Sequence, residues 1–257
     1  MPTVPASTDA EPTIRIRPFE RSELRQLLSI FSQAIPRPML DRSIYSAPGA
    51  EAFLARLLEH RSLHAHEQLW GVELEKVGLV AAAHTRLIED RHHLNNYAVL
   101  PAFQGHGLGS RMMTHWHDLA RAHGARRLSL DVALENEGAR RHYARFGFAD
   151  QARTYEYRLD GRVDSPALTG VQLVDWPLAQ ASFAAYGFGR FALALGSERY
   201  SVDLRVGEFR LSSFDARLLA VLRAMDPART ILVRSSEPLE NAAWSHVATS
   251  VHMTKEL

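Results

Sequence analysis

Residues 95–114 read NNYAVLPAFQGHGLGSRMMT, and this stretch decides how the rest of the chain is interpreted. It starts as a β-like run that Pro101 ends, continues as a glycine-rich turn over 104–109, and becomes a helical pattern at about Ser110. A strand, a glycine turn and a helix in this order can hold phosphate. Glycine lets backbone N–H groups approach an anion closely, and the helix N-terminus supplies unpaired donors.

The turn differs from the two common nucleotide-binding loops. It lacks the Gly-Lys-Ser/Thr ending of a P-loop, so ATP and GTP are poor candidates. Its glycines, Gly105, Gly107 and Gly109, have a G-x-G-x-G spacing, whereas the dinucleotide fingerprint requires G-x-G-x-x-G/A and position 110 is serine. The glycine turn alone therefore does not identify the ligand.

Two signatures together carry a family resemblance. The pattern Gln-x-x-Gly-x-Gly after a Val-x-Pro strand resembles the acyl-CoA-binding loop of the GNAT superfamily of N-acetyltransferases, with one more glycine at 105. About 30 residues downstream, positions 136–148 read NEGARRHYARFGF, which is similar to the family's N-x-x-A-x-x-x-Y-x-x-x-G-F helix. Both signatures occur in the family's order and spacing, and the resemblance covers roughly residues 13–158.

Apolar periodicity over residues 13–159 predicts the order β-α-α-β-β-β-α-β-α-β. The resemblance implies an α/β (α+β) fold with a mixed, mostly antiparallel sheet, splayed to admit a ligand and flanked by helices. It also implies that the segment between the first two strands covers the acceptor site. Four side chains of this segment would line an acceptor pocket: Phe31, Met39, Tyr45 and Phe53. For Phe31 and Phe53, packing in the core is an equally good interpretation.

The chain is expected to contain two folded parts. We assign residues 1–12 to a disordered tail and residues 13–159 to a GNAT-like catalytic domain. Residues 160–168 form a polar linker, and residues 169–257 form a smaller C-terminal α+β domain. The C-terminal part repeats the element order without a glycine loop, because serines at 212–213 lead into its helix as caps. A short helix at 239–244 and a strand at 247–253 would end it. It is either a degenerate second GNAT-like unit or an unrelated domain, and it would cover the sheet, pair subunits or close the acceptor cleft.

Composition narrows the functional classes. Hydrophobic residues make up 46% and charged residues 23% of 257, as in ordinary globular proteins, and a net charge of +1 favours neither nucleic acid nor membrane as a partner. Without cysteine there is no disulfide, thiolate nucleophile or thiolate metal site. The absence of a leader pattern and the strong preference for arginine over lysine predict a bacterial cytoplasmic protein.

The resemblance implies acetyl-CoA as the cosubstrate and no metal. Backbone N–H groups of the glycine loop would bind the pyrophosphate, and the pantetheine arm would lie along the preceding strand, with an N–H near Val99 or Leu100 aimed at the thioester oxygen. The expected cofactor-binding residues are Tyr97, Ala98, Val99, Gln104, Gly105, His106, Gly107, Leu108, Gly109, Ser110, Arg111 and Asn136. Many relatives carry Arg or Lys where this chain has Gln104 and His106, so weaker binding is expected unless Arg111 compensates.

The resemblance also implies roles in proton transfer. Tyr143 would act as general acid, because a phenol with a pKa of about 10 suits reprotonation of a thiolate. Asn136 would hydrogen-bond pantetheine or the adjacent backbone. His93 is the candidate general base, with Glu89, Asp90 or a chain of waters as alternatives and a surface role for His93 equally open.

These features predict an acyl-CoA-dependent N-acyltransferase that moves an acetyl group from acetyl-CoA to a primary amine by direct attack in a ternary complex. The acceptor would be a small-molecule amine or a peptide N-terminus, and a homodimer is left open. The alternative is a non-catalytic acyl-CoA-binding regulatory or scaffold module. Tyr143 and Asn136 favour the enzyme, whereas His106 and the additional domain favour the alternative.

Overall fold

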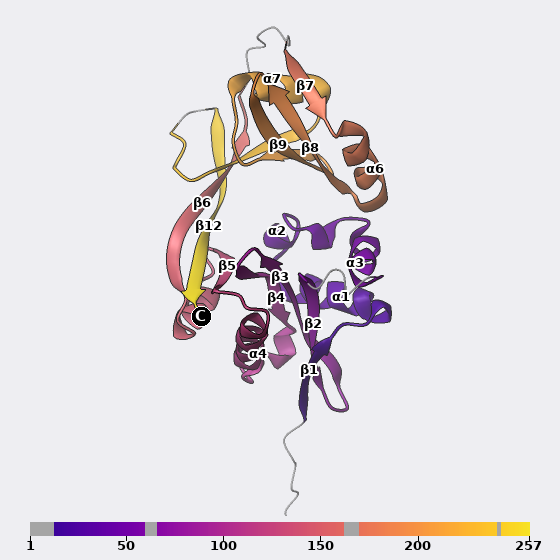
Figure 1. Cartoon of the computed structure of the whole chain (residues 1–257), viewed down its shortest axis with the longest axis vertical. Coiled ribbons are helices and arrows are strands. Elements are labelled where there is room, and N and C mark those ends of the chain that lie inside the picture. Colours follow the sequence, from indigo (N-terminus) through magenta and orange to yellow (C-terminus); the bar gives the residue numbers. More distant parts are fainter. Residues whose placement is uncertain (1–12, 60–65, 162–169, 241–242) are drawn as a thin grey trace, which may run out of the picture.

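The structure is a computed structural model that describes residues 13–59, 66–161, 170–240 and 243–257. Within these ranges the chain forms one 12-stranded sheet with helices on both sides, drawn out into two parts in Figure 1. The predicted tail and most of the predicted linker lie outside the described residues. None of the helices in the described ranges combines the length and apolarity needed to cross a bilayer.

The N-terminal half, residues 14–159, follows the predicted order of strands and main helices, with a short additional helix, α2, and three 3-10 turns in the described loops. The elements are β1 (Ile14–Pro18), η1 (Arg21–Glu23), α1 (Leu24–Ala34), α2 (Arg37–Leu40), η2 (Ile44–Ser46), α3 (Ala50–Glu59), β2 (Glu67–Leu74), β3 (Gly78–Ile88), β4 (Arg91–Val99), η3 (Pro101–Phe103), α4 (Leu108–Ala122), β5 (Arg127–Ala133), α5 (Glu137–Arg145) and β6 (Ala149–Leu159).

The C-terminal half, residues 171–256, is shorter. It comprises β7 (Val171–Val174), α6 (Trp176–Tyr186), β8 (Phe188–Leu195), β9 (Glu198–Arg205), β10 (Glu208–Leu211), α7 (Ala216–Met225), β11 (Thr230–Ser235) and β12 (Trp244–Glu256). The predicted helix at 239–244 is wrong in its described part. Trp244 already begins β12, because its backbone pairs with Leu159 of β6 and this tertiary pairing overrides local propensity.

Neighbouring strands follow the order β1-β2-β3-β4-β5-β12-β6-β11-β10-β9-β8-β7. All pairs are antiparallel except β4 with β5 and β10 with β11, which confirms the predicted mixed, mostly antiparallel sheet. From one edge of the sheet inward the N-terminal half contributes β1 to β5 in sequence order, and from the other edge inward the C-terminal half contributes β7 to β11 in sequence order. The C-terminal half therefore repeats the topology of the first, as expected for a degenerate second unit rather than an unrelated domain.

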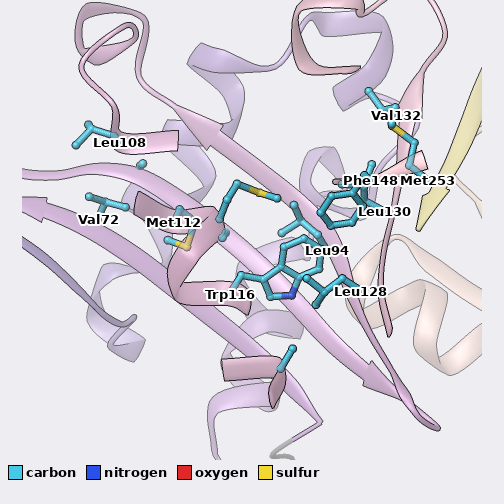
Figure 2. Packing of buried hydrophobic residues seen from close by; sticks show 14 of the residues in the cluster. Val72, Leu94, Leu108, Met112, Trp116, Leu128, Leu130, Val132, Phe148 and Met253 are labelled. Carbon is cyan, nitrogen blue, oxygen red and sulfur yellow. The ribbon is translucent and has the colours of Figure 1, made fainter. Parts of the chain in front are cut away.

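The halves exchange their last strands. β12 lies between β5 and β6, and the long β6–β12 pair connects the two parts of the molecule in Figure 1. Met253 of β12 is buried with Trp116 and Phe148 in the core of the N-terminal half (Figure 2), whereas Leu159 of β6 is buried in the core of the C-terminal half. The predicted domain boundary at 160–168 therefore stays a proposal that applies to the order of residues along the chain. In space, each half contains a strand of the other.

The sheet opens between β4 and β5. Their parallel pairing runs from Arg91 and Arg127 to Leu94 and Leu130 and then stops. At this point the register between β3 and β4 skips Asn95, which makes it the additional residue of a β-bulge. Beyond the bulge one edge of β4 has no strand partner among the described residues, and this is the splay that the resemblance implied.

Candidate functional site

A pocket of about 550 Å³ lies where β4 diverges from β5. Its wall comes from β4, the glycine turn, the first turn of α4 and one face of α5, and it brings together most of the predicted site residues: Tyr97, Ala98, Val99, Gln104, Gly105, Gly107, Leu108, Gly109, Ser110 and Tyr143. The predicted residues outside this wall are His93, His106, Arg111 and Asn136. Asn136 caps α5 instead, since its Oδ1 accepts a hydrogen bond from Ala139 N at 3.1 Å.

The glycine turn is built so that its donors stay open. Gly105 and Gly107 have φ angles of +80° and +75°, a left-handed conformation in which a β-carbon is costly. Gly107 is also the N-cap of α4 and supplies no side-chain cap. A β-carbon on Gly109 would lie 3.4 Å from His142 Nε2 and narrow the pocket. Among the described residues the N–H groups of 105–107 find no acceptor, so they and the helix N-terminus can bind an anion.

The positive charge at this pocket comes from Arg145. This residue lines the pocket from the last turn of α5, whereas Arg111 does not line it. Gln104 and His106 are both tied to backbone, because Gln104 Nε2 donates to Val99 O at 3.0 Å and His106 Nδ1 lies 2.9 Å from Gln104 O. The sequence analysis missed Arg145, although its helical spacing from Gly138 and His142 would have placed the three on one face.

The free edge of β4 offers one backbone donor near its end. Leu100 N–H donates to Val80 O at 2.9 Å and is therefore used in pairing with β3. Successive residues of a strand direct their polar groups to opposite sides, so the N–H of Val99 faces the free edge. The hydrogen bond from Gln104 to Val99 O agrees, since that carbonyl would otherwise belong to a neighbouring strand. Of the two donors considered from the sequence, that of Val99 remains available.

Three polar side chains of the pocket wall, Tyr97, His142 and Tyr143, lie close to the end of the glycine turn or on the same helix as a residue that does. Burial raises the pKa of Tyr143 to about 12, which keeps its phenol protonated at neutral pH. Tyr97 Oη and His142 Nε2 are buried and have no hydrogen-bond partner within the described structure. Such orphaned polar atoms are uncommon in folded proteins, so their presence here points to a polar ligand that completes them.

His93 lies on the other face of the sheet. Its neighbour His92 accepts a hydrogen bond from Trp116 on α4, so alternation directs His93 away from that helix. His93 is 8% exposed, with Nδ1 at 3.0 Å from Ser129 Oγ and Nε2 at 3.8 Å from Asp131 Oδ2. Burial lowers the pKa of His93 to about 4, so the imidazole is neutral at pH 7.

Asp131 links His93 to the exchanged strand. Its Oδ1 lies 2.9 Å from His252 Nδ1 on β12, and the His93 and His252 rings stack with centroids 6.5 Å apart. The alternatives Glu89 and Asp90 lie at the β3–β4 turn, where Asp90 pairs with Arg127 at 3.0 Å. The sequence analysis missed the Asp131–His252 pair, because no local pattern places β12 beside β5.

Two smaller pockets, of about 260 and 330 Å³, lie between the halves and take wall residues from both. Met39 lines the first and Phe53 the second, and their predicted contact with an acceptor stays a prediction. Phe31 is fully buried in the core, the other alternative. Tyr45 is also buried, with its hydroxyl 2.7 Å from Nδ1 of His84.

The corresponding position in the C-terminal half has no glycine turn. The expectation that serines 212–213 cap α7 is wrong: the N-cap is Asp215, whose Oδ1 accepts from Arg217 N at 2.8 Å. Arg217 Nε also lies 3.1 Å from this carboxylate. A carboxylate thus occupies the helix N-terminus where a phosphate would have to bind, which excludes that ligand there.

Comparison with known proteins agrees with this geometry. The acetyltransferase (GNAT) family matches residues 34–148. Glucosamine 6-phosphate N-acetyltransferase 1 of Oryza sativa subsp. japonica is 30% identical over 146 residues, which cover 53% of this chain and 82% of the rice protein.

Solved structures match nearly the whole fold. A tandem GNAT protein from the clavulanic acid biosynthesis pathway has a TM-score of 0.66 at 16% identity, covering 95% of this chain and 98% of that one. A putative acetyltransferase from Pyrococcus horikoshii has a TM-score of 0.63 at 18% identity, covering 95% and 89%. At these identities the likeness concerns the fold, and it includes the repeated C-terminal half.

Proposed function

The chain belongs to the GNAT family of acetyltransferases, and on that premise we propose that it transfers an acetyl group from acetyl-CoA to a primary amine by direct attack in a ternary complex. One observation carries the proposal. A single pocket joins unpaired N–H groups at a helix N-terminus, the free edge of a splayed strand and a protonated tyrosine. These are what phosphate, a pantetheine arm and a leaving thiolate respectively need.

The wall of the pocket fits acetyl-CoA in several respects. The N–H groups of 105–109 and the dipole of α4 would bind the pyrophosphate, with Arg145 adding a cation beside it. The orphaned Tyr97 Oη and His142 Nε2 would gain partners from a polar ligand. Pantetheine amides would pair with the open edge of β4 over 97–99, as an additional strand does.

The reaction needs one bond made, one broken and two proton movements. The neutral amine nitrogen attacks the thioester carbon, and Val99 N–H stabilises the negative charge on the oxygen. As the C–S bond breaks, Tyr143 donates its proton to sulfur. The proton of the attacking amine passes to His93, which is neutral at pH 7. Because burial lowers the pKa of His93 to about 4, the carboxylate of Asp131, 3.8 Å away, is needed to stabilise the imidazolium that forms.

Replacement of Tyr143 by Phe tests the general acid. We expect kcat to fall by roughly 10²–10⁴ while the Kd for acetyl-CoA, measured by calorimetry, stays within about twofold. Tyr200→Phe, an alteration in the C-terminal half, is the matched control and should leave both quantities unchanged. The name of the rice relative makes an amino sugar phosphate a reasonable first acceptor to assay.

Wild-type turnover that survives Tyr143→Phe would exclude Tyr143 as the proton donor. Saturable acetyl-CoA binding without turnover on any amine would favour a binding module over an enzyme. If neither acetyl-CoA binding nor turnover is observed, the glycine turn has kept the shape of the family's loop and lost its ligand.

A further inference from the structure

We infer that one of the two pockets between the halves, the pocket of about 260 Å³ lined by Met39 and Asp131, binds the acceptor. This acceptor is a primary amine that also carries an anionic group, either carboxylate or phosphate. The inference rests on the acetyl transfer proposed above and adds the substrate class. It also gives the C-terminal half a role: its arginines would select the acceptor.

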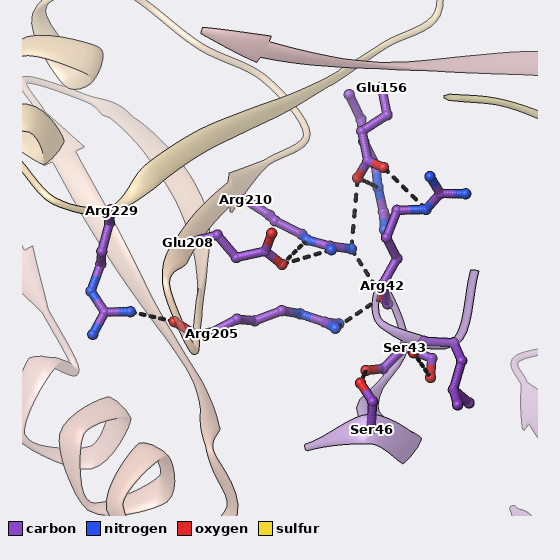
Figure 3. A network of polar contacts seen from close by, with 10 residues as sticks. Arg42, Ser43, Ser46, Glu156, Arg205, Glu208, Arg210 and Arg229 are labelled. Atoms are coloured by element: carbon purple, nitrogen blue, oxygen red, sulfur yellow. Dashed lines mark hydrogen bonds and ion pairs between the residues drawn. The ribbon is translucent and has the colours of Figure 1, made fainter. Parts of the chain in front are cut away.

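Positive charge exceeds negative charge at one end of this pocket. Arg42, Arg210 and Arg234 line it together with Glu156. Arg205 and Glu208 extend this cluster beyond the pocket wall, and all of these residues except Arg234 are labelled in Figure 3. Arg210 and Glu208 form a close pair, with Nη2 and Oε1 2.6 Å apart. The other two guanidinium groups of the pocket wall, those of Arg42 and Arg234, thus share a single carboxylate, that of Glu156.

Glu156 saturates none of the arginines around it. Its oxygens lie 3.6 Å from Arg42 Nε, 3.6 Å from Arg210 Nη1 and 4.0 Å from Arg234 Nε, all beyond hydrogen-bonding distance. The side chain of Arg234 is 51% exposed, and this is its one ion pair among the described residues. Guanidinium groups that share one distant carboxylate in a half-enclosed pocket favour entry of an anion, which they can bind in bidentate fashion.

Two of the arginines are held by the backbone of the other half. Arg205 Nη1 and Arg210 Nη1 both donate to Arg42 O, each at 2.9 Å. This carbonyl follows α2, in the segment that covers the acceptor side of the N-terminal half. Of the arginines in the pocket wall, Arg210 is therefore fixed in place before a ligand arrives, which lowers the entropic cost of organising this part of the wall.

The same pocket has a second carboxylate in its wall, that of Asp131, which lies 3.8 Å from the proposed base His93. Asp131 is the first residue of β5 beyond the pairing with β4, so it lies at the fork where the sheet opens. An ammonium group near Asp131 would face the gap between the strands, while an anionic group on the same molecule would reach Arg42 and Arg234. The volume of about 260 Å³ limits the acceptor to a small molecule or to the end of a longer one.

Matched amine pairs and Arg234→Gln test the inference. The pairs are glycylglycine with its C-terminal amide, and O-phosphoethanolamine with ethanolamine, assayed at saturating acetyl-CoA. We expect at least a tenfold higher kcat/KM for the anionic member of one pair, which identifies carboxylate or phosphate as the recognised group. Arg234→Gln should lose that preference. The control Arg199→Gln, an exposed arginine on β9 outside the pocket, should keep it.

Equal rates within both pairs, or a preference that survives Arg234→Gln, would overturn the inference. A second measurement separates this result from failure of the proposed function. If no amine is acetylated, calorimetric titration with inorganic phosphate still probes the pocket. Saturable heat lost in Arg234→Gln and kept in Arg199→Gln would support the anion site, because phosphate at the glycine turn would not respond to Arg234. No saturable heat, or heat unchanged in both variants, would overturn it.

Discussion

At the start of α4 the N-cap is Gly107, whereas at the start of α7, the corresponding helix of the C-terminal half, it is Asp215. The first leaves backbone N–H groups unpaired, and the second satisfies one of them with its own carboxylate. Capping stabilises a helix, but it also occupies the donors and reverses the charge that would attract phosphate. The two halves thus differ at the same strand–helix junction: one leaves its backbone donors open, and the other uses a donor to stabilise the helix.

The strands that lead into these helices differ as well. β4 continues from Asn95 to Val99 beyond its pairing with β5. β10 ends at Leu211, which is itself paired with Val233 of β11. Within its described residues the C-terminal half therefore has neither a glycine turn before α7 nor an unpaired end of the preceding strand.

The largest effect is expected from giving α4 the N-cap of α7. In Gly107→Asp the carboxylate would take up the N-terminal donors and repel phosphate, and the φ of +75° would be strained. We expect the Kd for acetyl-CoA, measured by calorimetry, to rise at least 100-fold. Gly124→Asp is the control, since Gly124 also has a positive φ, of +69°, and lies at the other end of the helix. Equal affinity in the two variants would refute this explanation of the difference between the halves.

The second effect concerns buried histidines that β10 lacks. His92 and Phe209 are the second residues of their strands and pair with equivalent positions of β5 and β11. Burial lowers the pKa of His92 and of His93 to about 4, whereas a histidine in the unfolded chain has about 6.5. Between these values the unfolded state binds more protons, so stability is lost as the pH falls from 6.5 towards 4.

We expect the free energy of unfolding to be lower at pH 5 than at pH 7.5 by roughly 2 kcal/mol for each of the two histidines. His92→Phe, which copies β10, should remove about half of this drop. At pH 7.5 it should cost about 1 kcal/mol, because Trp116 Nε1 loses its acceptor. Urea denaturation at both pH values measures the effect. A drop of unchanged size in His92→Phe would mean that this histidine is not the titrating group.

The smallest effect is expected at the capped helix. Asp215→Ala removes the N-cap of α7 and should lower the free energy of unfolding by about 1 kcal/mol. The Kd for acetyl-CoA should not change, because the C-terminal half lacks a phosphate site. Ser212→Ala should be nearly neutral in the same urea titration, since Asp215 and not the serine pair caps the helix. Any gain or loss of acetyl-CoA affinity in Asp215→Ala would contradict the assignment of a purely stabilising role.

Local patterns were enough to predict most helices and strands and many of the residues that line the candidate site. Alternation, helical spacing and the glycine turn are properties of short segments, so the pocket residues between Tyr97 and Ser110 could be named in advance. The choice between Val99 and Leu100 could not, since it depends on which side of β4 pairs with β3. Arg145 was missed because the signature helix was read for its motif positions and not for its face.

By itself, the sequence determined the family resemblance, the order of most elements and the glycine turn, because each depends on residues close together in the chain. Only the tertiary structure decided that β12 enters the sheet beside β5, where His252 meets Asp131 across 121 positions. It likewise decided that Arg210 reaches Arg42 O across 168 positions. Contacts at such separations depend on the packing of the whole sheet, and no local periodicity encodes them.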